Sequence, residues 1–152
     1  MSRIRYVLMV VIDPKGEDAI GLLKTKGPEF LIGKLTFPGG KIEPEESVFT
    51  AASRELREET GVRLPAKQWH FAGYKSTDEF ELHIVAARSK YVHEAKQMEA
   101  EPVLILPLAQ HCRKAKESPS EYTPDFLQVV AKSLVALKIS NALRDSLTQD
   151  VT

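Results

Sequence analysis

The chain has 152 residues and a mass of 17.0 kDa, the usual size of one compact domain and too small for two. Its 43% hydrophobic and 28% charged residues exclude a disordered or collagen-like chain. The 21 basic and 21 acidic residues cancel, so no global positive field exists to hold a nucleic acid or an anionic membrane surface. We therefore expect a single domain over residues 1–152 that binds neither.

Cysteine content and hydropathy predict the compartment. Cys112 is the only cysteine and cannot form an internal disulfide, which favours a reducing environment. The longest apolar run, from Tyr6 to Ile12, is far shorter than the roughly 18 residues that span a bilayer. The turn-forming residues 13–16 follow that run, where a signal peptide would have small residues for cleavage. We expect a cytoplasmic protein.

The first third of the chain predicts a hairpin followed by a long connection. Residues 3–12 are rich in β-branched side chains, and residues 19–23 resume the apolar pattern after a turn. Residues 24–34 contain two glycines and a proline, as is typical of a connection beside a binding site. Residues 35–37 form a short extended piece that ends at a Pro-Gly-Gly sequence.

The next segment predicts a helix over residues 47–60. Ser47 is a suitable N-cap, and Gly61 stands where a left-handed residue would end the helix. Phe49, Ala52 and Leu56 follow a spacing of three and four residues, which marks the buried side.

The remaining chain alternates strands and helices. We expect strands over residues 69–77, 80–91 and 103–106, a helix from Pro107 to about Lys116, a loop over 118–124 and a last helix over 125–143. In the last helix, Leu127, Val130, Leu134 and Leu137 form a stripe that indicates core packing rather than a dimer seam. The interleaved elements predict a mixed α/β domain.

Three glutamates share one side of the helix over residues 47–60. At about 100° per residue, Glu58 and Glu59 lie within about 60° of Glu55, beside the buried stripe. Like charges this close repel one another unless a cation lies among them. Clustered carboxylates suit Mg²⁺ or Mn²⁺, although Arg54 paired with Glu58 on a solvated helix face is the ordinary alternative.

The sequence around the glutamates favours the metal site. From Gly40 through Glu46 to Val62 the chain follows G-x5-E-x7-R-E-L-x-E-E-x-G-V. This stretch resembles the Nudix box of the MutT/Nudix hydrolases at every specified position. The resemblance implies a Nudix α/β/α sandwich, in which a mixed β-sheet is flanked by helices.

The resemblance also implies roles for the box residues. Divalent metal would be bound by Glu55, Glu58, Glu59 and the carbonyl of Gly39, while Arg54 would pair with Glu46 to hold the loop against the helix. Glycine suits positions 39 and 40 because the backbone must approach an ion and a phosphate closely. Lys41 is either a phosphate ligand or an ordinary surface lysine.

No other catalytic motif competes with the box. The histidines His70, His83, His93 and His111 lie at no metal-ligand spacing, so we expect them to be strand or surface residues. Because no activated Ser or Cys nucleophile is present, water must attack. The resemblance implies a glutamate base, either Glu55 in the box or, from a later loop, Glu99 or Glu101, and the sequence does not choose among them.

The resemblance implies a pyrophosphohydrolase acting on a nucleoside diphosphate linked to another group. A nucleoside or deoxynucleoside triphosphate, cleaved to monophosphate and pyrophosphate in MutT-like pool sanitation, is favoured mainly by elimination. Asp78 stands where many ADP-ribose hydrolases carry proline, and Phe80 is the nearest aromatic to a dinucleoside-polyphosphate tyrosine. ADP-ribose, dinucleoside polyphosphates and a catalytically silent binding module remain alternatives. The sequence leaves monomer and homodimer open.

Specificity must come from outside the box. We expect the base to lie against the connection over residues 24–34, where Phe30 could stack and Lys26 and Lys34 could bind outer phosphates. The alternative is that Phe30 fills the core, in which case Trp69, Tyr74 and Phe80 are the next aromatic residues to consider.

Overall fold

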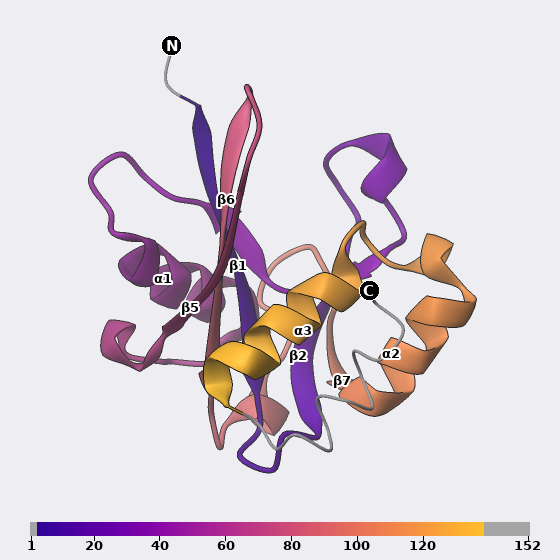
Figure 1. Cartoon of the computed structure of the whole chain (residues 1–152). Coiled ribbons are helices and arrows are strands. Elements are labelled where there is room, and N and C mark those ends of the chain that lie inside the picture. The colour runs from indigo at the N-terminus through magenta and orange to yellow at the C-terminus, as the bar shows by residue number, and fades with distance from the viewer. Residues whose placement is uncertain (1–2, 139–152) are drawn as a thin grey trace.

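The computed structural model describes residues 3–138, in which a sheet is flanked by helices on both faces (Figure 1). The strands are β1 (Ile4–Ile12), β2 (Asp18–Leu23), β3 (Leu35–Thr36), β4 (Gly39–Lys41), β5 (His70–Ser76), β6 (Phe80–Arg88) and β7 (Val103–Pro107). The helices are α1 (Val48–Thr60), α2 (Leu108–Glu117) and α3 (Phe126–Leu137). Short 3-10 turns are η1 (Glu29–Leu31), η2 (Ala66–Gln68), η3 (Val92–Glu94) and η4 (Pro119–Glu121). Within residues 3–138, no helix is long and apolar enough to cross a membrane.

Strand β1 lies at the centre of the sheet. One of its edges pairs in parallel with β6, from Ile4 opposite Phe80 to Ile12 opposite Arg88. Its other edge pairs antiparallel with β4 near its start and with β2 near its end. Strands β3 and β7 both pair with β2, and β5 pairs with β6, all antiparallel. The sheet is therefore mixed, as expected.

The apolar run of β1 is buried on both faces. Val7, Met9 and Val11 belong to the core beneath α1, whereas Val10 and Ile12 belong to the core beneath α2 and α3. A strand covered by helices on both sides has no solvent face, which explains its continuous rather than alternating hydrophobicity. The α/β/α sandwich is confirmed.

The sequence anticipated most elements but not all boundaries. The hairpin of β1 and β2 forms, with Ile12 opposite Ala19. The strand expected over 80–91 ends earlier, at Arg88. Ser89 Oγ accepts the backbone N–H of Tyr91 at 3.0 Å, so a local turn replaces the strand there before η3.

Strand β4 was not expected, because a Pro-Gly-Gly sequence reads as a turn. Gly39, Gly40 and Lys41 lie opposite Leu8, Val7 and Tyr6 of β1. A Cβ at Gly39 would lie 2.6 Å from the carbonyl oxygen of Val7, so this pairing is possible only because glycine has no side chain. Here close backbone approach overrides the weak strand propensity of glycine.

The last helix packs as its stripe predicts. Val130, Leu134 and Leu137 are buried, and Leu127 is half-buried against the same core. Helix α3 ends at Leu137, where Lys138 adopts a left-handed conformation. The helix was expected to reach residue 143, but residues 139–143 lie outside the described part of the chain.

Candidate active site

Helix α1 is delimited by the two capping residues that the sequence indicates. Ser47 Oγ accepts the backbone N–H of Thr50 at 3.1 Å at the N-terminus. At the C-terminus Gly61 has φ 78°, and its N–H bonds to the carbonyl of Arg57. Ala52 and Leu56 are buried against the sheet, so the packing of these two side chains determines which way the neighbouring glutamates point.

The three box glutamates of α1 are buried to different degrees. Glu59 is only 7% exposed, whereas the side chains of Glu55 and Glu58 are 15% and 40% exposed. The expectation that the acidic arc lies beside the buried stripe is thus confirmed. Two carboxylates stand at the edge of the core, and the third lies nearer to solvent.

Arg54 connects the loop before α1 with the acidic arc. Its Nε and Nη2 donate to the two carboxylate oxygens of Glu46 at 2.6 and 2.7 Å. Nη1 donates to Glu55 at 2.9 Å and to Glu58 at 3.3 Å, and Nη2 also donates to the carbonyl of Lys41 at 3.0 Å. A bidentate guanidinium holds a carboxylate in one orientation, so Arg54 fixes both the loop and Glu55.

The carboxylates differ in their proton affinities. Hydrogen bonding to Arg54 lowers the pKa of Glu46. Burial raises the pKa of Glu55, partly offset by Arg54, and burial together with the nearby charge of Glu55 raises the pKa of Glu59 to about 8. Both shifts reflect negative charge held in a poorly solvated place.

The donor set fits a hard divalent cation. Glu59 Oε1 is buried and has no hydrogen-bond partner within the described chain, although such oxygens are normally satisfied. A Cβ at Gly40 would lie 2.3 Å from the carboxyl carbon of Glu55, so a side chain at this position would displace that carboxylate. An ion among these oxygens would satisfy Glu59 and offset the repulsion between Glu55 and Glu59.

Unlike Glu58, Glu55 and Glu59 line a small cavity that we call the acidic pocket. Its volume is about 170 Å³, and it is lined by Leu22, Lys24, Lys26, Gly39, Glu55, Glu59, Glu99 and Glu101. The structure thus brings both loop glutamates, which lie 37 and 39 residues after Val62 at the end of the box, to the same pocket. Lys24, which sequence reasoning missed, is present as well, and its place as the first residue of the 24–34 connection was its only signal.

The loop that carries Glu99 is attached directly to α1. The backbone N–H of Lys96 donates to the carbonyl of Thr60 at 3.0 Å, and that of Met98 donates to the carbonyl of Glu59 at 3.2 Å. Because the end of α1 anchors this loop, Glu99 is held at the acidic pocket and contributes to the raised pKa of Glu59.

A second, larger cavity adjoins the acidic pocket, and we call it the apolar cleft. It has a volume of about 750 Å³ and is lined largely by apolar and aromatic side chains from β1, β5, β6, α3 and the 24–34 connection. Among them are Tyr6, Phe30, Tyr74, Phe80, Leu82 and Phe126. The two cavities share four lining residues, Leu22, Lys24, Gly39 and Glu101, and therefore lie side by side.

The aromatic residues named from the sequence fall in different places. Phe30 is 67% exposed and lines the apolar cleft, so the alternative that it fills the core is wrong. Tyr74 and Phe80 line the same cleft. Trp69 does not, because its ring is buried beneath α1 and its Nε1 donates to Ser53 Oγ at 2.9 Å.

The lysines named from the sequence also lie in different places. Lys26 lines the acidic pocket. Lys34 lines neither cavity and instead donates to the carbonyl of Ser120 at 2.9 Å, which corrects its expected place beside the outer phosphates. Lys41 is exposed and lines neither cavity, and its backbone carbonyl binds Arg54.

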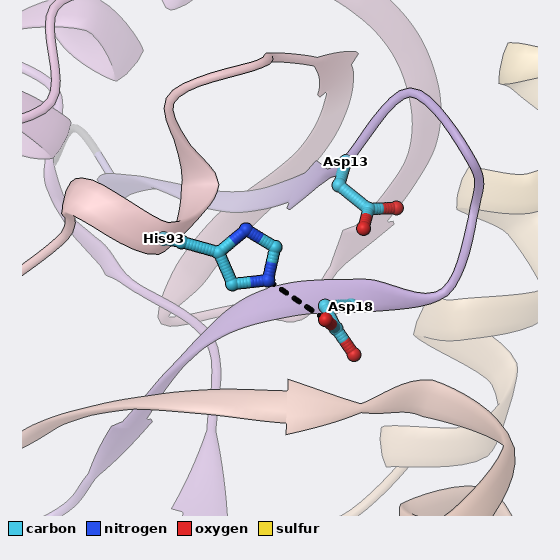
Figure 2. A group of neighbouring side chains, drawn as sticks. All are labelled: Asp13, Asp18 and His93. Carbon is cyan, nitrogen blue, oxygen red and sulfur yellow. Dashed lines mark hydrogen bonds and ion pairs between the residues drawn. The ribbon is translucent and has the colours of Figure 1, made fainter.

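One histidine lies in a group that could hold a metal ion, which the histidine spacing did not indicate. Figure 2 shows His93 of η3 facing Asp18 of β2, with Asp13 at the β1–β2 turn. The three ligand atoms lie within 4.8 Å of one another. His93 Nε2 pairs with Asp18 at 2.8 Å, and Asp13 accepts the N–H of Glu17 at 2.9 Å, contacts that explain the group without an ion. It belongs to neither cavity.

The fold and the box geometry agree with the family comparison. The NUDIX domain model matches residues 2–126, so this chain belongs to the Nudix family. Nudix hydrolases generally use a divalent metal, and the family implies pyrophosphohydrolase activity. Among curated proteins no significant match was found.

Solved structures share the fold at low sequence identity. A MutT structure from a study of Aliivibrio salmonicida and Vibrio cholerae has 20% identity and a TM-score of 0.65 over 86% of this chain and 99% of that one. The NUDIX domain of Shewanella oneidensis NrtR, crystallised with ADP ribose, has 18% identity and a TM-score of 0.72 over 90% of each chain. An ADP compounds hydrolase has 23% identity and a TM-score of 0.66 over 90% of this chain and 74% of that one.

Proposed function

We propose that this protein is a metal-dependent pyrophosphohydrolase acting on nucleoside triphosphates, including deoxynucleoside triphosphates, and releasing the monophosphate and pyrophosphate. The observation that carries the proposal is the pairing of the acidic pocket with the apolar cleft, which share four lining residues. A nucleotide also has two such parts, a charged phosphate chain and a base with flat aromatic faces. The role of the protein would be to remove damaged nucleotides from the cytoplasmic pool. It would act as a monomer or a homodimer.

The metal would be held by Glu55, Glu58, Glu59 and the Gly39 carbonyl. When bound, it neutralises charge on the phosphates and lowers the pKa of water. Arg54 keeps Glu55 oriented through its hydrogen bond, while Glu46 fixes the guanidinium from the other side. Gly40 leaves the space that the Glu55 carboxylate occupies. These contacts preorganise the oxygen ligands before substrate arrives.

We propose Glu99 as the group that accepts the proton from the attacking water. Of the three glutamates that the sequence leaves open, Glu55 is bound by Arg54. Glu101 Oε2 accepts the backbone N–H of Thr25 at 2.8 Å and pairs with Lys24. Glu99 is exposed, lines the acidic pocket, and its carboxylate makes no hydrogen bond or ion pair within residues 3–138. A free carboxylate in reach of the pocket is the geometry that a general base requires.

Two lysines support a substrate with several phosphates. Lys24 and Lys26 stand at the acidic pocket and supply positive charge beside the glutamates. Phosphate oxygens would contact these ammonium groups while the base lies against Phe30 and Phe80 in the apolar cleft. The cleft is large enough for a purine or a pyrimidine and offers aromatic surface to either.

A second substrate class is ADP-ribose. The fold similarity to a NUDIX domain that was crystallised with ADP ribose favours it, as does the apolar cleft volume of about 750 Å³. With ADP-ribose the products would be AMP and ribose phosphate, with no free pyrophosphate. The same fold could also hold ADP-ribose without cleaving it.

The deciding experiment measures products with Mg²⁺ across nucleoside triphosphates, ADP-ribose, dinucleoside polyphosphates and coenzyme A. We expect the highest kcat/KM for a triphosphate, with equal amounts of monophosphate and pyrophosphate. Preferential cleavage of ADP-ribose would replace the triphosphate assignment. Tight binding without turnover of any compound would indicate a silent binding module.

A further inference from the structure

Glu101 makes an unusual set of contacts for a loop glutamate. Its Oε2 accepts the backbone N–H of Thr25 at 2.8 Å and that of Lys26 at 3.4 Å, and lies 3.4 Å from the ammonium of Lys24. Only 11% of the side chain is exposed. One carboxylate oxygen therefore gathers three consecutive residues at the start of the 24–34 connection.

The backbone on both sides of Glu101 is anchored, so its carboxylate has a defined position. Before it, Met98 N–H donates to the carbonyl of Glu59. After it, Leu23 N–H donates to the carbonyl of Pro102 at 3.0 Å, and β7 begins its pairing with β2 at Val103. Glu101 thus links the end of α1, the sheet and the 24–34 connection.

The residues that Glu101 holds lie at the neck of a closed loop. Lys24 N–H donates to the carbonyl of Lys34 at 3.0 Å, and Gly33 N–H donates to the carbonyl of Lys24 at 2.8 Å. Phe30, at the far end of this loop, lines the apolar cleft, whereas Lys24 and Lys26 line the acidic pocket. A displacement at the neck would therefore move groups in both cavities.

We propose that Glu101 is a positioning residue, which holds Lys24 and Lys26 at the acidic pocket for the substrate's phosphates and keeps Phe30 over the apolar cleft. This inference rests on the proposed function. It removes Glu101 from the bases that the sequence leaves open and gives it a different task.

The chemistry of the contacts suits that task. Hydrogen bonds from backbone N–H groups to a carboxylate are stronger than those between neutral groups, so the neck is held firmly. The ammonium of Lys24 has three donors, and its contact with Glu101 leaves donors for phosphate oxygens. When phosphate draws Lys24 away, the two backbone N–H groups still bind Glu101, and the loop keeps its place.

Two variants separate positioning from proton transfer. Glu101→Ala removes every acceptor, whereas Glu101→Gln keeps a carbonyl oxygen that can accept the Thr25 and Lys26 N–H groups but carries no charge. Glu117→Gln on the exposed end of α2 is the matched control. The measurements are amide hydrogen exchange at Thr25 and Lys26, calorimetric affinity for Mg²⁺-pyrophosphate, and kcat and KM for the best nucleotide.

Positioning predicts a graded result. In Glu101→Ala, exchange at Thr25 and Lys26 accelerates, and the dissociation constant for Mg²⁺-pyrophosphate and KM both rise about tenfold, as expected when charge-assisted hydrogen bonds are lost. We expect kcat to change less than about threefold, because the groups held by Glu101 bind ground state and transition state alike. Glu101→Gln should recover slow exchange and most of the affinity.

Three results would overturn the inference. The first is that Glu101→Ala has the same pyrophosphate affinity and the same amide exchange rates as the Glu117→Gln control. Another is a fall of about 100-fold or more in kcat for Glu101→Gln with unchanged pyrophosphate affinity, the pattern of a lost base. The third applies if Glu101→Ala does not fold: it is fast exchange of the Thr25 and Lys26 amides in Glu101→Gln. A wild-type protein that cleaves no nucleotide would reject the proposed function, and exchange and pyrophosphate affinity would still decide the role of Glu101.

Discussion

The acidic pocket and the apolar cleft are assembled from the chain in opposite ways. Glu55 and Glu59 of the acidic pocket stand on α1, Gly39 comes from β4, the element before α1, and the loop that carries Glu99 is attached to the end of α1. The apolar cleft takes its walls from β1, β5, β6, α3 and the 24–34 connection, segments spread over most of the chain. The proposed metal ligands therefore come from one contiguous stretch, residues 39–59, whereas substrate choice depends on how distant segments pack.

The largest expected effect tests the pocket side of this comparison. Glu58→Gln or Glu59→Gln should lower kcat by several orders of magnitude and leave the fold intact, because each removes an oxygen ligand for the ion that organises the phosphates. Steady-state kinetics with circular dichroism checks both halves of the statement, with Glu117→Gln as control. Full turnover in excess EDTA, or in both variants, would reject the metal assignment.

Glu99→Gln should lower kcat by about 10²–10⁴-fold with little change in KM, since general-base catalysis contributes on that scale. Comparison with Glu101→Gln sharpens the division of labour between two neighbouring glutamates of the same pocket. The fall in kcat should therefore be far larger in Glu99→Gln than in Glu101→Gln. A kcat in Glu99→Gln equal to that of the Glu117→Gln control would return the role of base to Glu55.

Phe30→Ala tests the cleft side of the comparison. Loss of one stacking surface should raise KM about tenfold and weaken the preference among bases, with a smaller change in kcat. Because Phe30 is 67% exposed, the thermal midpoint should stay close to that of the wild type. A marked drop in the midpoint with unchanged KM would show that the ring supports the fold instead of the substrate.

A pair of lysine variants distinguishes the two ends of the 24–34 connection. Lys26→Met should raise KM for a triphosphate several-fold, because its ammonium stands at the acidic pocket. Lys34→Met removes an equal charge that lies at neither cavity, and its KM should match that of the wild type. Equal effects of the two substitutions would mean that only the overall charge of the connection matters.

The smallest expected effect concerns stability without metal. Because the folded protein raises the pKa of Glu59 to about 8, the contribution of Glu59 to stability is full below its unfolded pKa and is lost as pH rises toward 8. In EDTA, Glu59→Gln should therefore melt a few degrees above the wild type at pH 8 and close to it at pH 5. Millimolar Mg²⁺ should raise the wild-type midpoint but not that of Glu58→Gln/Glu59→Gln. Parallel pH curves for wild type and Glu59→Gln would contradict the raised pKa.

Local patterns were sufficient to predict the mixed fold and the two pocket glutamates that stand on α1. The caps at Ser47 and Gly61, the buried stripe with Leu56, and the arc of carboxylates depend on positions three and four residues apart. Those spacings convert directly into helix faces, so the sequence determined that Glu55 and Glu59 would lie at the edge of the core.

Only the tertiary structure decided which distant residues meet them. Pairing of β2 with β7 brings Glu101 to Thr25, and backbone bonds to the end of α1 bring Glu99 to Glu59. The same packing exposes Phe30 in the cleft and carries Lys34 away from it. No short-range spacing contains this information, because strand register and loop attachment are fixed by contacts between residues more than thirty positions apart.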